Sequence, residues 1–195
     1  SHYGVCLFGY RVALFEDTLA VSAIDESSNQ TTITNGTTAS SNNNSNRSGA
    51  IYIYKRSGTN WTQEAYIKAA NNDVNDLFGQ VLDLYENTLV VGARNEDSNQ
   101  ASITNGTTAS SDNSFVASGA VYVYTRSGTN WSQEAYIKAA NNDRDDWFGF
   151  VAIDNNTIVV STVGEDSNQT TITNGTTASS DNNYSYSGAV YVYQR

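Results

Sequence analysis

Two groups of acidic residues have a spacing that could bind a metal ion. In each group, aspartates stand in a short polar stretch just before a Phe-Gly pair, and a Glu-Asp pair follows further along the chain. Hard oxygen ligands of this kind suit calcium. The aspartates could instead cap turns by accepting hydrogen bonds from nearby backbone amides. The candidate calcium ligands are Asp73, Asp76, Glu96 and Asp97 in one group, and Asp143, Asp145, Asp146, Glu165 and Asp166 in the other.

Side chains for catalysis are scarce. His2 and Cys6 are the one histidine and the one cysteine, and both stand near the start of the sequence. We therefore expect no Ser-His or Cys-His pair. Glu64 and Glu134 recur at the same position of a repeated stretch and could be imagined as the two carboxylates of a glycosidase. We expect copies on separate outer strands to lie too far apart for that role, so the sequence predicts that the protein is not an enzyme.

The elements that position these residues come in three copies. Three Phe-Gly pairs are spaced by 70 residues, and three Ser-Gly-Ala motifs by 70 and then 69 residues. Repeats with a period of this kind indicate a propeller, a solenoid or an array. We predict one repeat domain with three units: residues 1–77 with an N-terminal segment, residues 78–147, and residues 148–195 without a last strand.

Alternating patterns within each unit predict strands. In Gly119–Tyr124, valines alternate with tyrosines, as the two-residue period of a strand requires. Residues 78–84 and 87–93 are typical of a hairpin, and residues 131–138 supply a fourth strand. The predicted fold is all-β and β-propeller-like, with blades of four antiparallel strands. The alternating tyrosines could pack between blades or form a platform for a sugar.

A long polar insert separates the second and third predicted strands of each unit. It consists almost wholly of Ser, Thr, Asn and Gly, and it contains the phrase ITNGTTASS in every copy. Asn-Gly favours a tight turn, and the residues beside it have good strand propensity. We predict a small polar hairpin or stacked ladder on each blade, with low-complexity disorder as the alternative. The candidate ladder residues are Asn35, Thr37, Asn105, Thr107, Asn174 and Thr176.

These motifs resemble the FG-GAP repeat of integrin-like β-propellers. The Phe-Gly pair is followed by Thr-Leu-Val-Val-Gly-Ala at residues 88–93 and by Ser-Gly-Ala-Val-Tyr-Val-Tyr at residues 118–124. The resemblance covers the whole chain, in two complete units and one truncated unit. Residues 131–139 and 141–149 are similar to a subgroup found in extracellular surface proteins. The resemblance implies a blade fold, an extracellular or cell-surface location, and a binding or adhesive task without catalysis.

The sequence departs from the family pattern in two places. Many members bind calcium in an Asp-x-Asp-x-Asp-Gly loop between the first two strands, but the corresponding turns here, at residues 15–17, 85–87 and 154–156, are too short to wrap an ion. A closed propeller typically has four to eight blades, whereas eleven strands are expected here, four, four and three. The chain is either a section of a longer propeller or pairs its edges with other copies, because unpaired edges invite strand addition.

Charge and hydropathy exclude two classes of partner. The net charge is -10 and Lys and Arg form no cluster, so the surface would repel nucleic acid and anionic membranes. The longest apolar runs are far too short to cross a bilayer. We therefore expect no membrane insertion, while a secreted or cell-surface location is what the resemblance implies.

Acceptors for N-glycosylation are numerous, although a chain so rich in Asn, Ser and Thr contains many by chance. The candidate acceptors are Asn29, Asn35, Asn46, Asn60, Asn105, Asn130, Asn168, Asn174 and Asn183.

The patterns together predict a non-enzymatic extracellular or cell-surface β-propeller module for adhesion or for binding proteins or glycans, within a larger or oligomeric assembly. The expected partners are other copies of itself or further blades, a surface protein, or a glycan. One alternative is a structural subunit of a filament or surface layer that assembles by strand complementation. Another is a calcium-dependent binding module.

Overall fold

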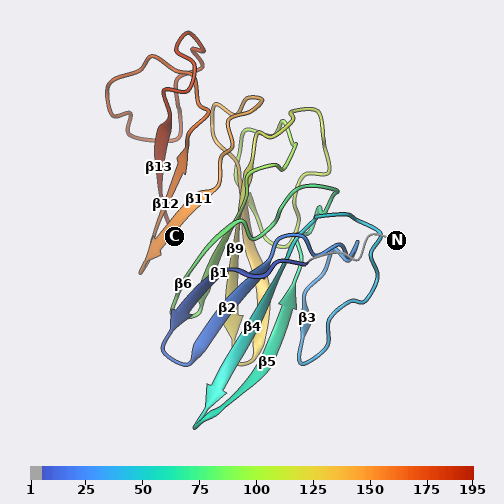
Figure 1. Ribbon diagram of the computed structural model, residues 1–195. Helices are drawn as coiled ribbons and strands as arrows, with labels where there is room; N and C mark the ends of the chain where they lie inside the picture. Colours follow the sequence, from blue (N-terminus) through green and yellow to red (C-terminus); the bar gives the residue numbers. More distant parts are fainter. Residues whose placement is uncertain (1–5) are drawn as a thin grey trace.

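The computed structural model describes residues 6–195, which form antiparallel β-sheets without any helix (Figure 1). Sheet 1 has the order β1 (Phe8–Phe15), β2 (Thr18–Ala23), β4 (Ala50–Ser57), β5 (Asn60–Ile67) and β3 (Thr34–Asn35). Sheet 2 has the order β6 (Val81–Tyr85), β7 (Thr88–Ala93), β9 (Ala120–Ser127), β10 (Asn130–Ile137) and β8 (Thr104–Asn105). Sheet 3 has the order β11 (Phe150–Asp154), β12 (Thr157–Thr162) and β13 (Ala189–Gln194). His2 lies outside the described residues.

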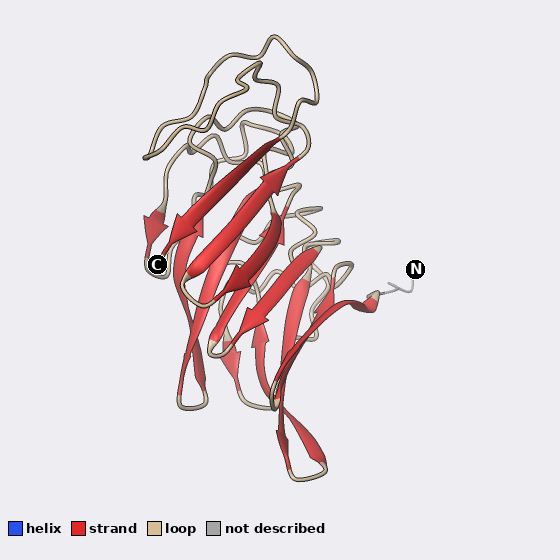
Figure 2. Ribbon diagram, turned by 90° about the vertical axis from the view of Figure 1, so that its left-hand side faces the viewer, coloured by secondary structure: helices blue, strands red, loops and turns tan. Residues whose placement is uncertain are grey.

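The sheets stack side by side, with the long inserts gathered beyond one end of the strands (Figure 2). Alternation along the third strands divides the apolar side chains between two faces. Ile51 and Ile53 of sheet 1 pack into one core with Tyr122 and Tyr124 of sheet 2, while the valines of β9 face the second core against sheet 3. Tyr122 and Tyr124 are fully buried, so packing between blades, one of the two roles considered for the tyrosines, is confirmed for this pair.

The repeated Phe-Gly and Ser-Gly-Ala motifs meet at the contacts between sheets. The backbone N–H of Phe78 donates to the carbonyl oxygen of Ser48 at 3.0 Å, and Phe148 repeats this bond with Ser118 at 3.1 Å. A Cβ added to Gly49 would lie 2.1 Å from the carbonyl oxygen of Phe78. Gly49 also has φ +84°, a region that favours glycine. The spacing of the two motifs therefore reflects a close backbone contact between neighbouring sheets.

The predicted four-stranded blade is wrong in one respect, because sheets 1 and 2 each have a short fifth strand. Thr34 pairs with Tyr66 and Asn35 with Ala65, so β3 lies against the outer edge of β5. The second insert does the same against β10. The predicted hairpin within each insert is also wrong, since the paired residues of β3 and β8 find their partners in the fourth strand of the sheet. Two short strands thus join the eleven that were expected.

None of the described residues belongs to a helix that could cross a membrane.

Candidate interaction surfaces

A glutamate on the outer strand of sheet 1 bridges to sheet 2. The Glu64 Oε1 atom on β5 accepts hydrogen bonds from Arg126 Nη1 at 3.1 Å and from Trp131 Nε1 at 2.9 Å. The guanidinium of Arg126 also lies over the Trp131 ring, 5.5 Å from its centroid, a favourable cation–π geometry. The Glu64 and Arg126 side chains are only 10% and 11% exposed, so this ion pair is poorly hydrated and holds the two sheets in register.

The same contact recurs between sheets 2 and 3. Arg195 donates to the Glu134 carboxylate from Nε at 2.8 Å and from Nη2 at 2.6 Å. Its Nη1 atom donates to Thr88 Oγ1 at 2.6 Å. Glu64 and Glu134, the imagined glycosidase pair, are therefore each engaged with an arginine of the next sheet, in two separate contacts.

Asn35 of the first insert adds a second bridge between sheets 1 and 2. Its Nδ2 atom donates to the Trp131 carbonyl oxygen at 3.3 Å, and its Oδ1 atom accepts from the Trp131 N–H at 2.8 Å. Asn35 and its equivalent in the second insert, Asn105, both lie in exposed residues. Asn35 therefore contacts a strand of the next sheet, and a binding role for the six ladder residues stays a prediction.

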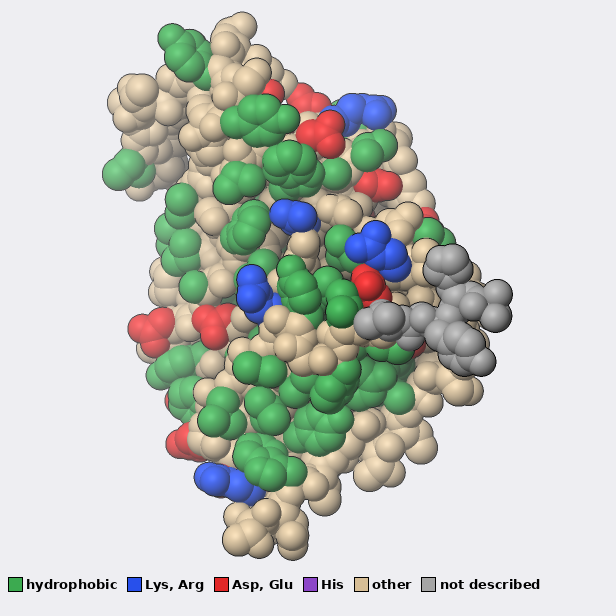
Figure 3. Space-filling model, in the orientation of Figure 1, with side chains coloured by type: hydrophobic (Ala, Val, Ile, Leu, Met, Phe, Trp, Pro, Cys, Tyr) green, Lys and Arg blue, Asp and Glu red, His purple; other side chains and the backbone are tan. Residues whose placement is uncertain are grey.

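The outer face of sheet 1 is apolar and exposed. Phe8, Val12 and Leu14 are 58%, 62% and 64% exposed, whereas their equivalents in sheet 2, Phe78, Leu82 and Leu84, are 0%, 8% and 5% exposed. Figure 3 shows the resulting apolar area over β1 and β2. Trp61 is 42% exposed on this side, and the Arg56 guanidinium lies over its ring. Sheet 1 thus exposes to solvent an arginine and a tryptophan that are equivalent to Arg126 and Trp131, the residues with which sheet 2 contacts sheet 1.

The outer face of sheet 3 presents the apolar part of the other half of this interface. Val190 and Val192 are 66% and 63% exposed, whereas the equivalent Val121 and Val123 of sheet 2 are buried against sheet 3. The two ends of the stack are therefore complementary in their apolar side chains, whereas the glutamate of the bridge belongs to the fourth strand, which sheet 3 lacks among the described residues.

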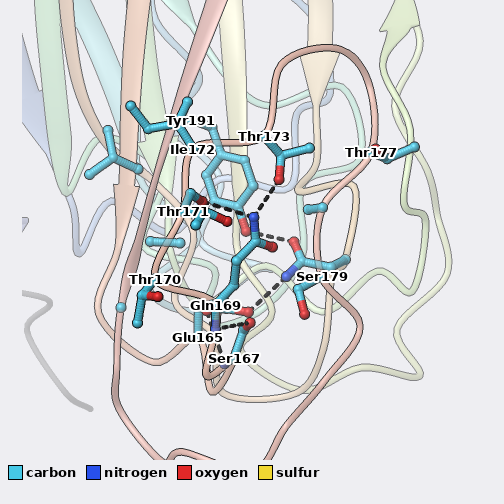
Figure 4. Close-up of a pocket in the computed structure, with 15 residues that line it drawn as sticks. Glu165, Ser167, Gln169, Thr170, Thr171, Ile172, Thr173, Thr177, Ser179 and Tyr191 are labelled. Atoms are coloured by element: carbon cyan, nitrogen blue, oxygen red, sulfur yellow. Dashed lines mark hydrogen bonds between the residues drawn. The ribbon is translucent and has the colours of Figure 1, made fainter.

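A groove of about 390 Å³ lies beside β13 in sheet 3 (Figure 4). Its walls are the start of β13, at residues 188–191, and the third insert, at residues 170–173 and 177–179. Glu165, Ser167 and Asn141 also line it. In sheets 1 and 2, the fourth strand lies between the third strand and the insert. The groove of sheet 3 occupies the place of that strand.

Sheets 1 and 2 each contain a buried ion pair that the sequence analysis did not find. Lys68 Nζ lies 2.8 Å from Glu26 Oε2, and Lys138 Nζ lies 2.7 Å from Glu96 Oε2. Both lysine side chains are 0% exposed, and burial lowers the pKa of each, while the glutamate opposes that shift. The sequence did show a lysine directly after the fourth strand in both units, which could have marked a buried charge. It could not show the partner, because each glutamate lies 42 residues away in the chain.

The predicted calcium ligands cap backbone amides. Asp76 Oδ2 accepts from the Asp73 N–H at 3.0 Å, and Asp146 Oδ2 accepts from the Asp143 N–H at 2.7 Å. Asp97 accepts from the Ala117 N–H at 2.7 Å, and Asp166 repeats this bond with Tyr186. Asp145 is exposed. Among residues 6–195, no three acidic, His or Cys side chains are grouped to hold a metal. These contacts support the capping role, and calcium binding stays a prediction.

The nine candidate glycosylation acceptors all lie in exposed residues. Asn35 is the one whose amide bridges two sheets, so a glycan there would compete with that contact. Glycosylation itself stays a prediction.

A comparison with known families supports the resemblance drawn from the motifs. The model of the FG-GAP repeat matches residues 61–124, which run from β5 through the Phe-Gly pair and β7 into β9. A search of curated proteins found no match. The matched stretch crosses the contact between sheets 1 and 2 and includes Glu64 and Tyr124. Residues 61–124 therefore match an FG-GAP repeat, and this match supports a β-propeller-like arrangement of the all-β chain.

Proposed function

We propose that this protein is a non-enzymatic interaction module of an extracellular or cell-surface assembly, and that it works by stacking its end sheets against sheets of the same kind. FG-GAP repeats are typical of extracellular and surface proteins, which supports the location. The complementary end faces are the observation that carries the proposal. If a protein on another surface supplied the sheet that stacks against this one, the contact would produce adhesion between the two surfaces.

The two exposed faces favour a head-to-tail contact between copies. Burying a large apolar side chain contributes about 1.5–3 kcal/mol, and the face of sheet 1 exposes Phe8, Val12 and Leu14. The opposite face exposes Val190 and Val192. A contact that joins two different faces forms rings if it closes and filaments if it does not. A filament formed in this way would be joined by its faces, whereas the structural-subunit alternative predicted from the sequence assembles by strand complementation.

Analytical ultracentrifugation over a range of protein concentrations tests the proposal. The wild-type protein is expected to sediment faster as its concentration rises. Leu14→Asp and Val192→Asp are each expected to abolish self-association by placing a charge in the contact. Ile103→Asp is the matched control, because Ile103 is 47% exposed but lies in the second insert.

A mixture of the two interface variants gives the sharper test. Leu14→Asp keeps an intact sheet 3 face, and Val192→Asp keeps an intact sheet 1 face. The mixture is therefore expected to form a dimer and nothing larger, although each variant alone is monomeric. A wild-type protein that stays monomeric at all concentrations, or a mixture that stays monomeric, would overturn the proposal.

A further inference from the structure

The groove of sheet 3 has the walls that hold the fourth strand in the other two sheets. Gln169 Nε2 donates to the Thr171 carbonyl oxygen at 2.9 Å and also to the Thr173 hydroxyl. Gln100 makes the same bonds in sheet 2, both at 2.8 Å. Ser187 Oγ donates to the carbonyl oxygens of Glu165 and Ser167 at 2.9 and 2.6 Å, as its equivalent does in sheet 2. The insert thus keeps its shape with no strand beside it.

Glu165 lies in this groove, where Figure 4 labels it beside Ser167 and Gln169. It is 3% exposed. Its carboxylate accepts from Asn141 Nδ2 at 2.8 Å and from the Ser167 N–H at 3.1 Å. Burial raises its pKa above the ordinary value for a glutamate. A buried carboxylate without a cation is costly, so the groove has a chemical preference for a positive group.

The equivalent glutamate in sheet 2 shows what Glu165 lacks. Glu96 makes the same two kinds of bond, with Asn71 Nδ2 at 2.9 Å and with the Ser98 N–H at 3.2 Å. It also accepts from Tyr136 Oη at 2.9 Å and from Lys138 Nζ at 2.7 Å. Tyr136 lies next to the last residue of β10, and Lys138 is the first residue after that strand. Both additional donors therefore come from the fourth strand.

In sheets 1 and 2, the lysine after the fourth strand also donates hydrogen bonds to acceptors other than the glutamate. Lys138 Nζ also donates to Ser118 Oγ at 2.7 Å, and Lys68 donates to the Gly49 carbonyl oxygen at 2.5 Å. In sheet 3 the equivalent groups belong to Ser187 and Gly188, and Gly188 lines the groove. A lysine placed there would meet a carboxylate, a hydroxyl and a carbonyl oxygen.

We infer that this groove is a strand-acceptor site for the fourth strand of an FG-GAP repeat, an extended segment whose sequence ends in Tyr-Ile-Lys and whose lysine pairs with Glu165. The segment would add to the open edge of β13, as in β-augmentation, and its outer edge would meet Thr173 and Asn174 as β5 meets β3. The inference rests on the proposed function, since both join repeats of the same kind, and it names the chemistry of the partner at one site.

Fluorescence polarisation with a labelled peptide of residues 130–140, NWSQEAYIKAA, tests the inference. The full chain carrying Leu14→Asp is used, because that substitution blocks stacking and so separates peptide binding from self-association. Saturable binding is expected. A peptide with Lys138→Gln is expected to bind at least about tenfold more weakly, since breaking a buried ion pair is strongly unfavourable.

Two protein variants complete the experiment. Glu165→Gln is expected to weaken binding of the wild-type peptide by at least about tenfold and to erase the difference between the two peptides. Asp154→Asn removes an exposed carboxylate from the hairpin of the same sheet and is expected to bind like the parent. The peptide variant leaves the protein unchanged, so it stays informative even if Glu165→Gln disturbs folding. No binding, equal binding of a scrambled peptide, or equal binding of both peptides would overturn the inference.

Discussion

Asp76 and Asp146 are buried carboxylates in the turns that precede two of the Phe-Gly pairs. Both are 3% exposed. Burial is the main cause that raises the pKa of Asp76 from 3.8 to about 8, and that of Asp146 to about 7. Neighbouring carboxylates, including Glu96 beside Asp76, add to the shift. The recurring Asn-Asn-Asp stretch predicted an acidic cluster, but the sequence could not show that one aspartate is buried.

Substitution of Asp76 should change how stability depends on pH. The folded protein binds the Asp76 proton more tightly than the unfolded chain, so this residue makes the free energy of unfolding fall as pH rises from about 4 to about 8. Asp76→Asn removes that contribution and keeps an oxygen that can accept from Asp73. Thermal melts between pH 4 and pH 8 are expected to show a smaller decline for the variant than for the wild type.

Asp145→Asn is the control for this pH effect, because Asp145 is exposed. Its melting temperatures should follow the wild-type profile. Parallel profiles for Asp76→Asn and the wild type would contradict the assignment of a raised pKa.

The residues that bridge the sheets could be located from the sequence but not assigned a role. Glu64 and Glu134 recur at one strand position, which marks them as special. Their partners lie in the next unit, however, and Arg126 is 62 residues from Glu64. A long-range pairing of this kind depends on how the sheets stack, and no local pattern encodes it. The buried lysines Lys68 and Lys138 were missed because each pairs with a glutamate 42 residues away in its own unit, which no local pattern encodes.

The strands themselves differ in how well their sequences predict them. The long strands follow a two-residue alternation that a packed sheet requires, so the hairpin and the third strand of each unit, and the fourth strand of the first two units, were predicted near their observed positions. The two-residue strands β3 and β8 were not predicted. Their Thr-Asn sequence carries no alternation, and they form because the outer edge of β5 or β10 offers unpaired backbone groups.

The close approach of neighbouring sheets at Gly49 makes a second testable prediction. Gly49→Ala would place a Cβ 2.1 Å from the carbonyl oxygen of Phe78, so sheets 1 and 2 would have to separate. We expect the free energy of unfolding to fall by about 1–3 kcal/mol more than in Gly58→Ala, the range typical of overpacking. Chemical denaturation measures both values.

Gly58 is a matched control for Gly49. Its φ is also positive, at +61°, but nothing lies within 4 Å of an added Cβ. Both variants therefore carry backbone strain, and only Gly49→Ala carries the clash. Equal losses of stability in the two variants would show that the contact between sheets tolerates an added methyl group.

The molecule as a whole is held together by contacts between units. Sheet 2 contributes Tyr122 and Tyr124 to the core shared with sheet 1, and Val121 and Val123 to the core shared with sheet 3. Both of its faces are therefore buried by neighbours. A repeat protein of this kind derives much of its stability from interfaces between adjacent units.

A single unit is consequently expected not to fold alone. A fragment of residues 78–147 would expose both faces of sheet 2 to water. Its circular dichroism should show no cooperative thermal transition, whereas the full chain should melt cooperatively under the same conditions. A cooperative melt of the fragment would mean that one sheet is stable without its neighbours.

The hydrogen bonds from Phe78 to Ser48 and from Phe148 to Ser118 are the same contact between neighbouring sheets, formed twice in one chain. A chain that gained or lost one whole unit would therefore form the same Phe-to-Ser hydrogen bond at the new boundary, because both residues recur in each unit. Duplication or deletion of one unit would therefore preserve these bonds between neighbouring sheets, so the architecture allows the chain to change length in steps of one unit without a new kind of contact.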